Sequence, residues 1–92
     1  MISFTEAHSL LTQMALHIGA LNTGYNCRVT VSTTGDRAVL ETHVFIQDEG
    51  KPRHISTNMV FSDWMERDFH HAVEKLAGYI LAAEEQSMEM AA

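Results

Sequence analysis

The sequence predicts an α+β domain in the order α-β-β-β-α, in which a three-stranded antiparallel sheet has both helices packed on one face. Two observations predict this fold class. Apolar residues recur at helical spacing, about every 3.6 residues, toward both ends of the chain. In the middle of the chain, apolar and polar residues alternate with a period of two, and two short turn sequences interrupt the alternation.

The first helix is expected over residues 4–22. Ser3 and Glu6 are spaced as in a capping box, in which the hydroxyl and the carboxylate accept hydrogen bonds from free backbone N–H groups. The segment Asn22-Thr23-Gly24 supplies a left-handed residue that ends the helix. One apolar stripe runs along this helix: Phe4, Ala7, Leu10, Leu11, Met14, Ile18 and Leu21.

Three strands are expected over residues 25–32, 38–47 and 54–61, and turns at 34–37 and 48–52 make them an antiparallel meander. The alternation assigns one set to the face beneath the helices: Tyr25, Cys27, Val29, Val31, Ala38, Leu40, Val44, Ile46, Ile55, Thr57, Met59 and Phe61. It assigns a second set to the open face: Asn26, Arg28, Thr30, Ser32, Glu41, His43, Phe45, Gln47, His54, Ser56, Asn58 and Val60.

The second helix is expected to begin at Ser62 or Asp63, both of which are favourable capping residues. Its buried stripe comprises Met65, Phe69, Ala72, Val73, Leu76, Ile80 and Ala83. The apolar pattern weakens from about residue 85, so the tail is expected to fray. The length of 92 residues predicts a single domain over residues 1–92.

Charge is concentrated in the second half of the chain. The sequence has 12 acidic and six basic residues, a net charge of −6, and nine of the acids lie in residues 47–92. Such a surface repels nucleic-acid phosphates and favours a basic protein surface. The chain has no apolar run of membrane-spanning length, no secretory-signal pattern at its start and a single cysteine. We therefore expect a cytoplasmic protein with no membrane partner and no free nucleic-acid partner.

The sequence predicts neither a metal site nor catalysis. His70 and Glu74 lie one helical turn apart, but a structural zinc site usually uses four protein ligands and a catalytic one three, and no third is evident. His43 and His54 are expected to be polar cross-strand neighbours. Cys27 alternates inward with no base beside it, as a buried free cysteine does. Without a nucleophile or phosphate-loop motif, the protein is expected to be non-enzymatic and to need no cofactor.

The element order resembles that of double-stranded RNA-binding domains. That family contacts phosphates through a lysine cluster at the start of its second helix. The corresponding segment here is Asp63-Trp64-Met65-Glu66-Arg67-Asp68, in which three of six residues are acidic. The acids therefore stand where such a domain would meet phosphates, and they either mimic phosphates or only solubilise the surface.

The chain resembles the small acidic phage anti-CRISPR proteins, especially inhibitors of the type I-F RNA-guided surveillance complex. The resemblance rests on size, absent catalytic motifs, a compact α+β pattern and six acids: Asp48, Glu49, Asp63, Glu66, Asp68 and Glu74. It implies binding to a Lys- and Arg-lined groove, so that target DNA cannot pair with the guide RNA. The acids would replace DNA phosphates, while Arg28, Lys51 or Arg53 would meet acidic protein patches or the guide RNA backbone.

Expected exposure and charge add Trp64, Arg67 and Phe45 to these candidate partner-binding residues. A different class of function is a small interaction module that associates with itself through Phe45 and Val60, or a phage assembly or accessory subunit. Concentration-dependent self-association would favour this alternative over the inhibitor.

Overall fold

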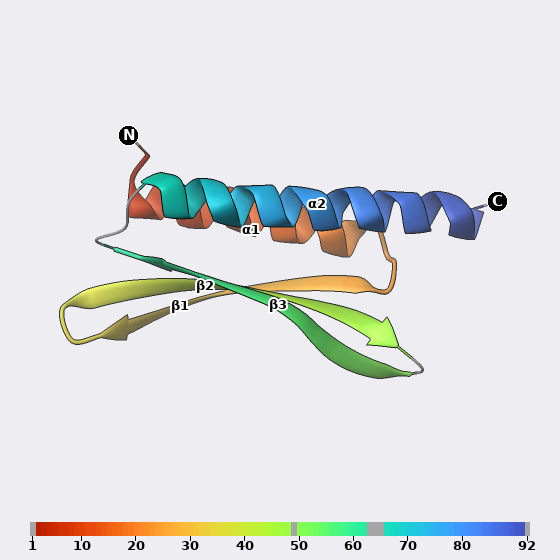
Figure 1. Cartoon of the computed structure of the whole chain (residues 1–92), viewed down its shortest axis with the longest axis horizontal. Coiled ribbons are helices and arrows are strands. Elements are labelled where there is room, and N and C mark those ends of the chain that lie inside the picture. Colours follow the sequence, from red (N-terminus) through yellow and green to blue (C-terminus); the bar gives the residue numbers. More distant parts are fainter. Residues whose placement is uncertain (1, 49, 63–65, 92) are drawn as a thin grey trace.

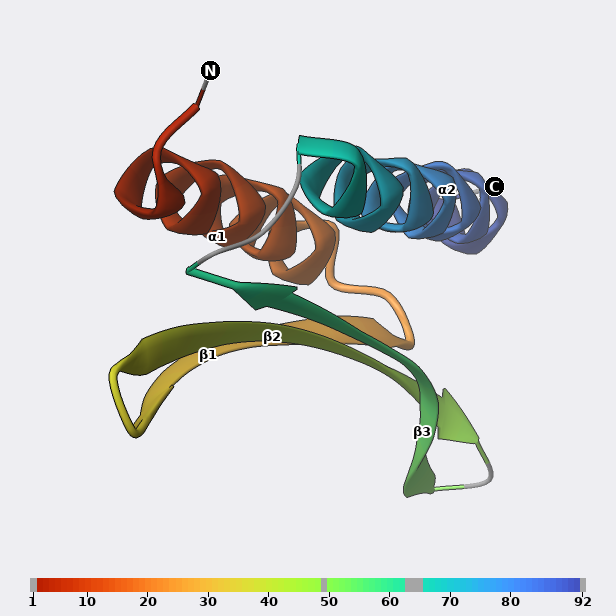
Figure 2. The ribbon, with the colours of Figure 1, turned by 60° about the vertical axis from the view of Figure 1, so that its left-hand side comes forward.

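The structure is a computed structural model that describes residues 2–48, 50–62 and 66–91, and it has a layer of helices above a sheet (Figure 1). In chain order the elements are α1 (Phe4–Ala20), β1 (Tyr25–Thr34), β2 (Arg37–Asp48), β3 (Lys51–Phe61) and α2 (Glu66–Ala91). The strands form one antiparallel sheet in the order β1-β2-β3. Figure 2 shows both helices on the same side of this curved sheet. The predicted α+β fold is confirmed.

The helix α1 begins where the sequence predicts and ends at Ala20, before the predicted residue 22. The Ser3 hydroxyl accepts a hydrogen bond from the Glu6 N–H group at 3.1 Å and caps the first turn. At the other end, Asn22 has a φ of 53°. This left-handed conformation cannot continue a right-handed helix, so the chain turns away from α1 toward β1.

The strand β3 contains a β-bulge. Val44 of β2 lies opposite Ser56, whereas the next residue of β2, Phe45, lies opposite His54. Ile55 is therefore an additional residue on β3, and it packs at the margin of the core. Because alternation restarts on each side of the additional residue, the bulge decides which face each later side chain of β3 occupies.

The bulge overturns part of the predicted facing of β3. Residues directly opposite each other in an antiparallel pair share a face, and Val60 lies opposite the buried Leu40. Val60 is accordingly 1% exposed, whereas Met59 is 50% exposed. Three residues predicted on the open face lie on the face beneath the helices: Ser56, Asn58 and Val60. Of the residues predicted beneath the helices, Thr57 and Met59 lie on the open face, and the side chain of Phe61 lies outside the description.

The core lies between the helices and the sheet, where the predicted apolar stripes meet. Its buried residues are Ala7, Leu11, Ile18, Leu40, Val44, Val60, Phe69, Ala72 and Leu76. From β1, Tyr25, Cys27 and Val29 pack against this cluster. Val31 was also assigned to the buried face, but it is 47% exposed because it lies on an edge strand beyond the part of β1 that packs against the core.

The helix α2 continues to Ala91, through the segment where the sequence predicts fraying. The Gly24 N–H group donates a 2.7 Å hydrogen bond to Gln86 Oε1, and Ala83 is fully buried. A further hydrogen bond of 2.7 Å runs from Gln47 N–H to the Gly24 carbonyl. Gly24 therefore links the last turns of α2 to the end of β2.

The start of α2 also differs from the prediction. Ser62, one of the two predicted caps, belongs to the hydrogen-bonded end of the sheet, because its hydroxyl accepts from Ala38 N–H at 3.0 Å. Its own N–H group donates to the Ala38 carbonyl at 2.9 Å. The other predicted cap, Asp63, lies outside the described residues, and α2 is described from Glu66. Neither described helix combines the length and apolar character needed to cross a membrane.

Candidate functional site

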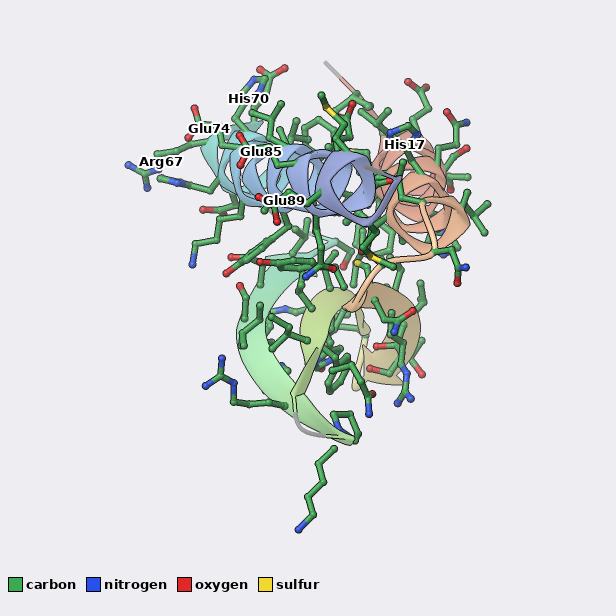
Figure 3. All side chains as sticks on the ribbon, turned by 90° about the vertical axis from the view of Figure 1, so that its right-hand side faces the viewer. His17, Arg67, His70, Glu74, Glu85 and Glu89 are labelled. Carbon is green, nitrogen blue, oxygen red and sulfur yellow. The ribbon has the colours of Figure 1, made fainter. Side chains whose placement is uncertain are left out.

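The exposed side of α2 is acidic. The helix contains two basic residues and six acidic ones, all exposed apart from the half-buried Asp68: Glu66, Asp68, Glu74, Glu84, Glu85 and Glu89. Figure 3 shows Arg67, His70 and Glu74 on the side of α2 that lies away from α1, with Glu85 and Glu89 closer to its C-terminal end. Four predicted site residues therefore share this helix: Glu66, Arg67, Asp68 and Glu74.

Three acids of this surface were not among the predicted site residues: Glu84, Glu85 and Glu89. The sequence predicts a fraying tail at these positions, whereas the structure has a regular helix there. The signal that identifies them is the continued helical spacing of covered residues, from Ile80 through Ala83 to the half-buried Gln86.

Apolar side chains lie among these carboxylates. Leu81 is 63% exposed and Met88 is 73% exposed. They are seven residues apart, and Glu74 precedes Leu81 by the same interval, so all three lie along one side of the helix. A surface that combines carboxylates with exposed apolar groups suits a protein partner that offers basic and apolar side chains.

The side chains of four predicted site residues are not described by the structure. Glu49, Asp63 and Trp64 lie outside the described residues, and Asp48 is described only as the last residue of β2. The predicted acidic cluster at the start of α2 is therefore described at Glu66 and Asp68 alone.

The open face of the sheet gathers aromatic and basic side chains around Phe45. The Phe45 ring centroid is 5.0 Å from that of His54 and 6.4 Å from that of His43. The guanidinium carbon of Arg28 lies 5.7 Å from the same centroid, within cation–π range. Together with Thr30, these residues line an open hollow of about 460 Å³. Phe45, predicted to be exposed, is half-buried because its neighbours partly cover it.

A hydrogen-bond network lies beside this hollow. His43 Nε2 is 2.9 Å from the Glu41 carboxylate, and His43 Nδ1 is 3.4 Å from His54 Nε2. The Thr57 hydroxyl is 3.2 Å from His43 Nδ1 and 2.6 Å from His54 Nε2. The predicted proximity of the two histidines is thus confirmed. The contribution of Thr57 is not predicted, because unbroken alternation along β3 puts this residue on the opposite face.

The sheet differs from α2 in charge. Residues 25–61 contain four acidic and four basic residues, so this segment is electrically balanced. The predicted residues Lys51 and Arg53 are both exposed on β3, after the turn that joins it to β2. Within the described parts of the chain, no group of three or more His, Cys, Asp or Glu side chains is placed to hold a metal ion.

Cys27 is a half-buried free cysteine of β1. Burial raises the pKa of its thiol from 9.0 to about 11, because desolvation disfavours the thiolate. The side chain lines a hollow of about 510 Å³ between α1 and β1. A thiol that stays protonated at neutral pH suits packing better than nucleophilic chemistry.

Comparisons of the chain with protein-family models, curated proteins and solved structures give no match.

Proposed function

We propose that this protein is a non-enzymatic phage anti-CRISPR inhibitor, which binds the guide-RNA-containing type I-F surveillance complex and blocks hybridisation of target DNA. The observation that supports the proposal is the set of exposed carboxylates along α2. In this function, Glu74, Glu85 and Glu89 occupy positions that DNA phosphates would take in a Lys- and Arg-lined groove.

The spacing of these carboxylates suits phosphate mimicry. Glu85 and Glu89 are one helical turn apart, a rise of about 6 Å along the helix axis. One strand of duplex DNA presents a phosphate about every 3.4 Å along its axis, so this rise is close to two nucleotide steps. A row of basic side chains that binds alternate phosphates could therefore pair with carboxylates on one side of α2.

The sheet has a separate part in the proposal. Arg28 is exposed on its open face, whereas Lys51 and Arg53 are exposed at the beginning of β3, where they pair with Asp48 and Ile46 on the other face. They would contact acidic protein patches or the guide RNA backbone, while α2 contacts the basic groove. This division follows the difference in charge between the two layers, an excess of acids on α2 and a balance of acids and bases in the sheet.

The test measures target-DNA binding by the purified type I-F complex with a stoichiometric amount of this protein. The test variant is Glu74→Lys/Glu85→Lys, and the matched control is Glu6→Lys/Asp36→Lys, which reverses two exposed acids outside α2. Both variants change net charge equally. We expect the α2 variant to need at least about tenfold more protein for half-inhibition, a difference near 1.4 kcal/mol. The control should inhibit as the unchanged protein does.

Salt provides a second readout of the same proposal. Inhibition by the unchanged protein should weaken as ionic strength rises, because screening reduces attraction between exposed charges. Inhibition by the α2 variant should depend less on salt. Two results of the variant comparison would overturn phosphate mimicry by α2. An equal loss of inhibition in the α2 variant and the control would show that only net charge matters. Full inhibition by the α2 variant would show that these carboxylates are not needed.

Self-association is a second candidate function. Val60 is buried, so the expected contact through Phe45 and Val60 loses one of its two residues. The exposed Leu81 and Met88 of α2 favour a different contact between copies. Sedimentation velocity over a range of protein concentrations tests this candidate. A dimer that Leu81→Ser disrupts would support it, and a monomer at every concentration would exclude it.

A further inference from the structure

The open face of the sheet holds two histidines whose ring nitrogens face each other. His43 belongs to β2 and His54 to β3, and the distance between His43 Nδ1 and His54 Nε2 is 3.4 Å. The bulge at Ile55 is what leaves His54 on the same face as His43. We propose that these two nitrogens bind one divalent transition-metal ion such as Zn²⁺, with water completing the coordination.

The distance between the nitrogens suits a shared ion. Zinc–nitrogen bonds of about 2.0–2.1 Å at a tetrahedral angle place two imidazole nitrogens about 3.3–3.4 Å apart. The 3.4 Å separation of His43 Nδ1 and His54 Nε2 matches this geometry.

The Glu41 carboxylate prepares His43 for this role. A carboxylate accepts hydrogen bonds, so the protonated nitrogen of His43 is Nε2, whose N–H group donates a hydrogen bond to Glu41 at 2.9 Å. In the neutral ring the other nitrogen, Nδ1, then presents a lone pair toward His54. A carboxylate behind a ligating histidine is the usual support of zinc-bound imidazole, because it fixes the tautomer and raises the basicity of the ligand.

The Thr57 hydroxyl alone cannot donate hydrogen bonds to both histidine nitrogens. It lies 2.6 Å from His54 Nε2 and 3.2 Å from His43 Nδ1, but it has only one proton to donate. In the tautomer of His54 that carries its proton on Nδ1, both facing nitrogens are unprotonated and one hydroxyl can satisfy only one of them at a time. A cation between the nitrogens would satisfy both, and the Thr57 oxygen would accept a hydrogen bond from a metal-bound water.

Two charged residues of opposite sign, Arg28 and Glu41, lie near the His43–His54 pair. Arg28 lies opposite His43 in the pairing of β1 with β2, and its positive charge disfavours a second cation nearby. The Glu41 carboxylate offsets this repulsion. With two protein ligands and this balance, the site is expected to bind imidazole-preferring ions such as Zn²⁺ and Cu²⁺, and not Mg²⁺, which prefers oxygen ligands.

The experiment is a calorimetric titration of the full chain with zinc chloride at neutral pH in a buffer that does not chelate metals. We expect saturable binding of one zinc ion per chain. His54→Gln should weaken binding at least tenfold, and Glu41→Gln should weaken it about 10-fold, at the low end of the range for such supporting carboxylates. His70→Gln, which removes an exposed histidine from α2, is the matched control and should bind zinc as the unchanged protein does.

Histidine side-chain resonances give an independent readout of where zinc binds. Zinc should shift the ring signals of His43 and His54 and leave those of His17 and His70 in place. Circular dichroism checks that His54→Gln keeps its fold, which is expected because His54 is exposed on an edge strand. The proposal is wrong if the unchanged protein does not bind zinc, if folded His54→Gln binds it equally well, or if His70→Gln weakens binding as much.

Discussion

The outward side of α2 and the open face of the sheet are both polar surfaces, but they are assembled in different ways. On α2, carboxylates such as Glu85 and Glu89 come from one element and are positioned by the helical period alone. On the sheet, His43 comes from β2 and His54 from β3, and they meet only because the two strands pair in a particular register. One surface depends on local periodicity and the other on long-range pairing.

This difference determines how each surface responds to substitution. Replacing a single carboxylate on α2 removes one charge from a row and leaves the others in place. On the sheet, a change in the register of β3 would move its side chains to the opposite face and separate His54 from His43. The β-bulge at Ile55 is therefore as important to the sheet surface as the residues that form it.

The strongest test of this comparison is a pair of substitutions on β3, Val60→Asn and Met59→Asn. Val60 is 1% exposed and packs in the core, so an amide there loses apolar burial and has to be desolvated. We expect a loss of about 4 kcal/mol in the free energy of unfolding. Met59 is 50% exposed, so its variant should stay within about 0.5 kcal/mol. Urea denaturation measures both values, and the opposite ranking would restore the facing predicted from sequence.

The sequence misleads at β3 for a physical reason. One alternating set contains Ile55, Met59 and Phe61 beside Thr57, and the other contains Val60 beside His54, Ser56 and Asn58. Unbroken alternation therefore favours burial of the first set along the whole strand. The bulge breaks the alternation and places both Ile55 and Val60 against the core. In the helices each apolar stripe is continuous, which is why those buried faces are largely predictable from the sequence.

The two sides of α2 provide the next test, through Leu76→Ala and Leu81→Ala. Leu76 is fully buried, so truncation should leave a cavity and lower the free energy of unfolding by about 3 kcal/mol. Leu81 is 63% exposed, and its truncation should cost less than about 0.5 kcal/mol. Thermal unfolding of both variants measures the difference. Similar losses would mean that Leu81 is covered in solution, as a contact between copies through α2 requires.

A smaller effect is expected where α2 meets the beginning of the sheet, at Gln86. In Gln86→Ala the Gly24 N–H group loses the acceptor that lies 2.7 Å away in a half-buried position. We expect a loss of about 1.5 kcal/mol in the free energy of unfolding and faster amide exchange in the last turns of α2. Glu85→Ala, at the adjacent exposed position, is the control and should change neither measurement appreciably. Unchanged exchange in Gln86→Ala would mean that this hydrogen bond does not hold the helix end.

The same hydrogen bond shows a limit of sequence reasoning about the candidate surface. Local periodicity identifies Glu66 and Glu74 as exposed acids of a helix. The order of the last turns of α2 depends in addition on the hydrogen bond between Gln86 and Gly24, which are 62 residues apart in the sequence. A contact at that separation has no local signature in the sequence. For Glu84, Glu85 and Glu89, which belong to the same helix, the local signal is limited to the helical spacing of Ile80, Ala83 and Gln86.

The smallest predicted effect has the opposite sign and concerns Thr42, which is 1% exposed on the face of β2 beneath the helices. Its hydroxyl is buried and has no hydrogen-bond partner among the described residues. Thr42→Val replaces that hydroxyl with a methyl group of similar shape, so we expect a gain of about 1 kcal/mol in the free energy of unfolding. Thr30→Val, on the exposed open face, is the control and should change stability by less than about 0.5 kcal/mol. Destabilisation by Thr42→Val would show instead that the hydroxyl is hydrogen-bonded in solution, for example to a buried water.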